Sequence, residues 1–158
     1  MTETTFSGMA ELQTPDDLLR KMKFDLDRLK TVKNDQYAAF DFFITAEHML
    51  DWLHPGYSEE AKRRDLRTSN VLLKITSHIA NGAKHFEAKA KHHKPVSGIE
   101  KQRYVEEGYV EDGYFENPII VTLSADEVAE LGCSAINVVE LAERVLEWWI
   151  QSLHSSKT

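Results

Sequence analysis

Apolar residues recur at a helical spacing in four long segments of this sequence, and this periodicity constrains the fold more than any other feature. The segments cover residues 14–32, 35–53, 70–86 and 124–153. A helix with one apolar face must bury that face against another element. The sequence therefore predicts a mainly α protein whose helices form an up-and-down four-helix bundle.

Local signals mark the ends of these helices. Thr14-Pro15-Asp16-Asp17 combines a capping hydroxyl, a proline at the first helical position and acids near the positive helix end. His54-Pro55-Gly56 ends the second helix, and Ser124-Ala125-Asp126-Glu127 opens a last helix that is expected to run to about Leu153. Residues 1–13 are expected to be a flexible tail, and 14–154 a single domain.

The pattern changes between residues 103 and 123. An acidic, tyrosine-containing unit repeats from Tyr104 to Asn117, Asp112-Gly113 is a favoured hairpin turn, and Pro118–Leu123 has the pattern of a strand. We expect a β-hairpin at about 103–123, inserted before the last helix, with Arg103–Glu111 paired to Tyr114–Leu123. Its tyrosines and carboxylates suit a basic protein partner or a sheet edge in a dimer. The alternative is a solvated hairpin that covers the bundle.

Composition excludes several classes of protein. The single cysteine, Cys133, excludes an internal disulfide and a cysteine-rich zinc site. No apolar run approaches the ~18 residues of a membrane span, and the N-terminus lacks the pattern of a signal peptide. We therefore expect a cytoplasmic protein that does not bind a membrane.

The net charge of −7 is unevenly distributed along the chain. Residues 59–94 carry nine basic and four acidic side chains, a balance of +5, whereas residues 100–147 carry three basic and twelve acidic ones, a balance of −9. The basic third could bind the phosphates of RNA or another ligand, or it could pair with the acidic third. The candidate binding residues on this basic strip are Arg63, Arg64, Arg67, Lys74, His78, Lys89 and Lys91.

The helix that ends near Phe86 carries the candidate catalytic residues. Its predicted buried face contains Ile75, Ile79, Gly82 or Ala83, and Phe86, and the adjacent face contains Lys74, His78, Asn81 and His85. His85 could act as a general acid or base near neutral pH, with Asn81 and Lys84 positioning a phosphate. The alternative is a polar network between helices in which the histidines are satisfied.

Glu47, His48 and Asp51 form a second polar group, on the helix 35–53. Glu47 falls in an apolar stripe, where a carboxylate needs a partner, and we expect an ion pair with Lys74, His78 or His85. Such a pair would raise the pKa of the histidine and lower the pKa of Glu47. A metal site built on Glu47, His48 and Asp51 is a weaker alternative. We expect no cofactor and no metal.

The segment Ala80–Phe86, A-N-G-A-K-H-F, together with the aromatic-rich helix Tyr37–Leu53, resembles the HEPN superfamily of small prokaryotic proteins. The chain is also similar to uncharacterised bacterial proteins that share the run I-A-N-x-x-K-H. The HEPN resemblance implies a bundle of four or five helices, often dimeric, in a family with many metal-independent ribonucleases. Asn81 and His85 match the polar residue and the histidine of the family motif.

Ala80, however, stands where that motif has arginine, the side chain that stabilises charge developing on phosphate. The resemblance therefore implies a homodimeric protein associated with nucleic acid or a protein partner, with weak or no catalysis. The alternatives are a metal-independent endoribonuclease that uses His85 with Lys84 and Asn81, a metal-binding bundle, and a purely structural dimer module.

Overall fold

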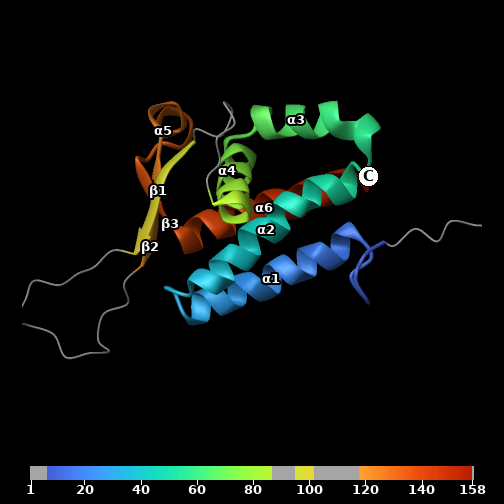
Figure 1. The fold of residues 1–158 in the computed structure, drawn as a ribbon, viewed down its shortest axis with the longest axis horizontal. Helices are drawn as coiled ribbons and strands as arrows, with labels where there is room; N and C mark the ends of the chain where they lie inside the picture. The colour runs from blue at the N-terminus through green and yellow to red at the C-terminus, as the bar shows by residue number, and fades with distance from the viewer. Residues whose placement is uncertain (1–6, 87–94, 102–117, 158) are drawn as a thin grey trace, which may run out of the picture.

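The computed structural model describes residues 7–86, 95–101 and 118–157, and these residues form a mainly helical chain with a small sheet (Figure 1). The predicted mainly α class is therefore confirmed. The described helices are α1 (Pro15–Thr31), α2 (Gln36–Leu53), α3 (Glu60–Ser69), α4 (Val71–His85), α5 (Ala125–Leu131) and α6 (Val138–Ser155), with a short 3-10 helix at Tyr57–Glu59. The described strands are β1 (Val96–Lys101), β2 (Ile119–Leu123) and β3 (Ala135–Asn137).

The first two helices begin where the sequence predicts. The Thr14 hydroxyl accepts a hydrogen bond from the Asp17 N–H at 3.2 Å, and the Asp17 carboxylate accepts one from the Thr14 N–H at 2.8 Å. This reciprocal pair is a capping box, which satisfies two otherwise free amides. Asp35 caps α2 by accepting hydrogen bonds from the amides of Tyr37 and Ala38.

Helices α2 and α6 contact each other, and each of them also contacts α1 and α4, around the main hydrophobic core. Figure 1 shows α1 and α2 lying side by side, with α3 at the top of the view leading to the upper end of α4, where α4 begins. Among the described residues, no helix is both long and apolar enough to cross a membrane. The up-and-down bundle arrangement stays a prediction. The largest fully buried side chains include Met22, Phe42, Phe43, Leu73 and Trp149.

The buried face of α4 differs from the predicted one. Asn70 caps the helix by accepting hydrogen bonds from the amides of Leu72 and Leu73. The helix ends at His85, and Phe86 leaves the helical path with a φ of 64°. Its ring is 98% exposed, so the predicted burial of Phe86 is wrong. The residues that α4 buries are Leu73, Ile75, Thr76, Ser77 and Ala80.

The sheet has the order β1-β2-β3, and both neighbouring pairs are antiparallel. Ile119 pairs with Lys101 of β1, and Val121 pairs with both Ile99 of β1 and Ile136 of β3. The strand at 119–123 is thus central, and its partners differ from the predicted Arg103–Glu111. The rest of the predicted hairpin, residues 103–117, lies outside the described residues.

The predicted last helix is divided into two. α5 ends at Leu131, and its C-cap is Gly132, whose φ of 82° lies in the left-handed region that glycine adopts without steric cost. The chain then forms β3, which pairs with β2. Asn137 caps the start of α6 by accepting a hydrogen bond from the amide of Val139. The prediction of one continuous helix from Ser124 to Leu153 is therefore wrong. The break places the sheet beside α4 and α6, which both contact it.

Candidate functional site

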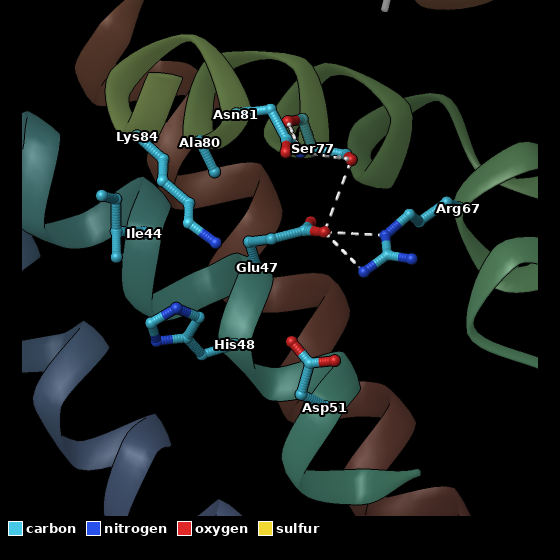
Figure 2. Close-up of a pocket in the computed structure, with 9 residues that line it drawn as sticks. All are labelled: Ile44, Glu47, His48, Asp51, Arg67, Ser77, Ala80, Asn81 and Lys84. Atoms are coloured by element: carbon cyan, nitrogen blue, oxygen red, sulfur yellow. Dashed lines mark hydrogen bonds and ion pairs between the residues drawn. The ribbon is translucent and has the colours of Figure 1, made fainter. Parts of the chain in front are cut away.

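A polar cleft of about 510 Å³ lies between α2, α3 and α4 (Figure 2). α2 and α4 each contribute four side chains. On both helices the second, third and fourth of these residues follow the first by three, four and seven positions, so all four lie on one side of the helix. We call this site the polar cleft. It is lined by Ile44, Glu47, His48 and Asp51 of α2, by Arg67 of α3, and by Ser77, Ala80, Asn81 and Lys84 of α4.

Glu47 is the most buried acid of the polar cleft, with 9% of its surface exposed. Arg67 donates to its Oε1 from Nε and lies equally close through Nη2, both at 2.7 Å, and the Ser77 hydroxyl reaches the same oxygen at 3.4 Å. The other oxygen, Oε2, is buried and has no hydrogen-bond partner in the described part of the chain. The carboxylate is therefore held at one oxygen only.

The electrostatics of Glu47 follow from this environment. Burial disfavours the charged carboxylate and raises its pKa to about 6, and the attraction of Arg67 offsets only part of that effect. The sequence predicted the opposite direction, with a partner among Lys74, His78 and His85. The structure corrects both points: the partner is Arg67, and desolvation outweighs the ion pair.

Asn81 contributes a hydrogen-bond acceptor to the polar cleft. Its Nδ2 donates to the Ser77 carbonyl at 2.8 Å and lies 3.4 Å from the Ser77 hydroxyl. Because the carbonyl can only accept, the amide orientation is fixed, and Oδ1 is the atom left over. No described residue donates a hydrogen bond to that oxygen.

Lys84 and His48 face each other across the polar cleft. Figure 2 shows the Lys84 side chain extending from α4 toward α2, with its amino group on the side where the His48 ring lies. Both residues are exposed. Within the described ranges, neither side chain makes a hydrogen bond or an ion pair. The cation and the imidazole are therefore available to a ligand.

Asp51, which lines the polar cleft, is paired with Arg63 of α3. The Arg63 guanidinium lies 3.3 Å from the Asp51 carboxylate and donates to the carbonyl oxygens of His54 and Gly56. These contacts fix the start of α3 against the end of α2. Arg63 is consequently occupied by structural partners.

The other predicted site residues are spread over the molecule. Lys74 pairs with Glu130 of α5 at 3.1 Å, and His78 accepts a hydrogen bond from the Val96 N–H through Nδ1 at 2.9 Å. His85 is exposed at the end of α4 and does not line the polar cleft, although Asn81 and Lys84 do. Arg64 is exposed on α3. Lys89 and Lys91 lie outside the described residues.

The weaker metal alternative gains no support. Glu47, His48 and Asp51 line the same polar cleft, as their spacing on one helix requires. Within residues 7–86, 95–101 and 118–157, however, no group of three histidine, cysteine, aspartate or glutamate side chains converges as metal ligands would. The polar cleft instead combines carboxylates with a guanidinium and an ammonium group.

One relationship escaped the sequence analysis. Ala80 of α4 lines the same polar cleft as Arg67, which α3 brings in from another part of the chain. A guanidinium is thus present in the cleft together with the α4 residues Ala80, Asn81 and Lys84. The sequence did contain a signal for this contact. Residues 44, 47, 48 and 51 have the same helical spacing as residues 77, 80, 81 and 84, and each set lies on one helix face.

Comparison of the chain with family models, with curated proteins and with solved structures gives no match. We therefore infer the function from the residues and geometry of the polar cleft.

Proposed function

We propose that this protein binds a phosphate-bearing ligand, with single-stranded RNA or its nucleotides as the class, in the polar cleft. The observation that carries the proposal is Lys84, a cation that extends into the cleft without a carboxylate partner among the described residues. His48 lies across from it and can add a hydrogen bond to a phosphate oxygen. A cleft of about 510 Å³ falls within the usual size range of small-ligand sites.

Several basic side chains of the strip are already paired with carboxylates, and for this reason we place the ligand at Lys84 in the polar cleft. Arg63, Arg67 and Lys74 each contact a carboxylate at 2.7–3.3 Å. An arginine or lysine already paired with a carboxylate contributes less to phosphate binding, because the pair must open or share its charge. The strip as a whole is therefore a weaker RNA-binding surface than its formal charge of +5 suggests.

Binding of labelled single-stranded RNA over a range of salt concentrations tests the proposal. The Lys84→Ala variant should bind several-fold more weakly, and its log-log salt slope should fall by about 0.7 if one phosphate contact is lost. Lys23→Ala is the matched control, because Lys23 is an exposed helical lysine on α1, which contributes nothing to the cleft. Equal binding by the Lys84 and Lys23 variants would contradict the proposal.

A second candidate function is metal-independent cleavage of RNA, favoured by the carboxyl of Glu47 with its pKa of about 6. In this reaction Glu47 takes the proton of a ribose 2′-OH, and O2′ attacks phosphorus to form a cyclic phosphate. The bond from phosphorus to O5′ breaks, and protonated His48 gives its proton to O5′. Lys84 and Arg67 stabilise the negative charge that develops on the phosphoryl oxygens.

Cleavage of RNA in the presence of a chelator tests this second candidate. Glu47→Gln and His48→Ala should each lower the rate about 100-fold or more if the two groups transfer protons. The HEPN resemblance predicts instead that His85→Ala removes activity. Activity that survives both cleft substitutions and disappears with His85→Ala would reject the cleft mechanism in favour of the motif-based one.

A further inference from the structure

Two residues that line the polar cleft, Glu47 and Asn81, each have an unused hydrogen-bond acceptor. Glu47 Oε2 is buried without a partner, and Asn81 Oδ1 receives no hydrogen bond, in both cases within the described part of the chain. Ser77 lies between them, since its hydroxyl is 3.4 Å from both the Glu47 carboxylate and the Asn81 amide nitrogen. A buried acceptor without a donor, such as Glu47 Oε2, is costly, so a ligand that supplies an N–H group to it gains binding free energy.

The remaining walls of the polar cleft suit a flat group attached to a phosphate. Ile44 and Ala80 supply apolar surface, and Lys84 supplies the positive charge. A nucleobase has this combination, with apolar faces, polar groups at its edge and a phosphate on its ribose. The acceptors would then meet the edge of the base, while the lysine meets the phosphate.

Two acceptors select among the bases. Guanine presents two adjacent N–H donors, at N1 and at its 2-amino group, on one edge. Adenine and cytosine place a ring nitrogen acceptor next to the amino group, and uracil places its one N–H between two carbonyl acceptors. An acceptor of the ligand that faces Glu47 or Asn81 would be repelled.

We propose that the polar cleft recognises guanine nucleotides, with Glu47 and Asn81 as specificity-determining residues that accept hydrogen bonds from the guanine edge. This inference rests on the proposed binding of a phosphate-bearing ligand at the same cleft. Arg67 has a positioning role, because it holds Oε1 of Glu47 and leaves Oε2 for the ligand.

Calorimetric titration of the full chain with single nucleotides tests the inference. At pH 7.5, GMP should bind about tenfold or more tightly than AMP, CMP or UMP, because a good pair of hydrogen bonds to a base edge discriminates by at least that factor. IMP, which lacks the 2-amino group, should bind several-fold more weakly than GMP. A single-stranded RNA with one guanine tells whether the nucleotide is bound free or within a chain, according to which of the two binds more tightly.

Glu47→Gln is the decisive variant. Glutamine keeps an oxygen for Arg67 but replaces the second acceptor with an amide donor, so the preference for GMP should disappear. Asn81→Ala provides an independent test if the glutamine variant unfolds, and it should reduce the preference several-fold. In Lys84→Ala, all four nucleotides should weaken while the ratio of GMP to AMP affinity is kept.

The outcomes separate the two proposals. Equal, Lys84-dependent binding of GMP and AMP, unchanged by Glu47→Gln or Asn81→Ala, would overturn the guanine inference and leave the phosphate-binding function standing. The absence of nucleotide and RNA binding at low salt would overturn both.

Discussion

Arg67 binds Glu47 through a single carboxylate oxygen: its Nε and Nη2 both lie 2.7 Å from Oε1, while Oε2 is buried without a partner in the described part of the chain. The ion pair therefore compensates only part of the cost of burying the carboxylate. Burial raises the pKa of Glu47 to about 6, and the one-sided contact with Arg67 lowers it only in part.

The stability of the fold should depend on pH through Glu47. The pKa of this carboxyl is about 6 in the folded chain against an ordinary value of 4.5, so the folded state holds its proton more tightly. The contribution of Glu47 to stability is fully present below pH 4.5 and is lost as pH rises through 6, by about 2 kcal/mol in total. Urea unfolding of wild type and Glu47→Gln across this range should show the variant gaining about that much relative to wild type. A pH-independent difference would contradict the prediction.

Removal of Arg67 should destabilise the protein most at alkaline pH. Arg67→Ala leaves the buried Glu47 carboxylate unpaired, and we expect a loss of about 2 kcal/mol at pH 8 and less at pH 5, where Glu47 takes up a proton. Adding Glu47→Gln should recover most of the loss in a double-mutant cycle. Arg64→Ala is the control, because Arg64 is exposed on the same helix and does not line the cleft.

The cap of α4 should be measurable as a stability term. Asn70 Oδ1 accepts hydrogen bonds from Leu72 and Leu73 at 2.9 and 3.2 Å, so Asn70→Ala should cost about 1 kcal/mol. Asn70→Asp keeps the acceptor and should be nearly neutral. Chemical unfolding of both variants checks this, and equal losses would show that the side-chain oxygen is not what matters.

Two glycines should respond to alanine in opposite directions. Gly132 has a φ of 82°, so Gly132→Ala should destabilise by about 1 kcal/mol, although a Cβ there would meet no atom within 4 Å. Gly82 lies within α4 and is equally uncrowded, so Gly82→Ala should stabilise by up to about 1 kcal/mol. Melting temperatures of the two variants test the pair. A loss of stability in both would contradict this account of α4.

Helix starts were predictable because their signals are local. Thr14, Asp35 and Asn70 each accept hydrogen bonds from amides two or three residues further along the chain. Because donor and acceptor are so close in sequence, a short segment is enough to predict the contact. The break at Gly132 was missed for the opposite reason. Residues 135–137 leave the helical pattern because they pair with β2, a contact between distant segments that the apolar spacing of 124–153 does not reveal.

Most residues of the polar cleft were named from the sequence, but as separate groups, and Ile44 and Ser77 were not named at all. Asn81 and Lys84 were grouped with His85, while Arg67 was placed on the basic strip. Which residues of neighbouring helices meet depends on how each helix is rotated about its axis, and α4 buries Thr76 and Ser77 where a simple apolar stripe would not. The polar side chains therefore had to be placed by the packing of α2, α3 and α4.

The attachment of α3 has a consequence for how the site works. This helix contains no fully buried residue, and its links to α2 are the contacts of Arg63 and Arg67, with Leu66 as its partly buried apolar contact. Concentrated salt should therefore loosen α3 while the hydrophobic interior stays closed, and its amides should exchange hydrogen sooner than those of α2. Ion pairs thus hold α3 in place, whereas buried side chains hold α2 and α4. The entrance of the polar cleft can therefore widen without unfolding of the protein.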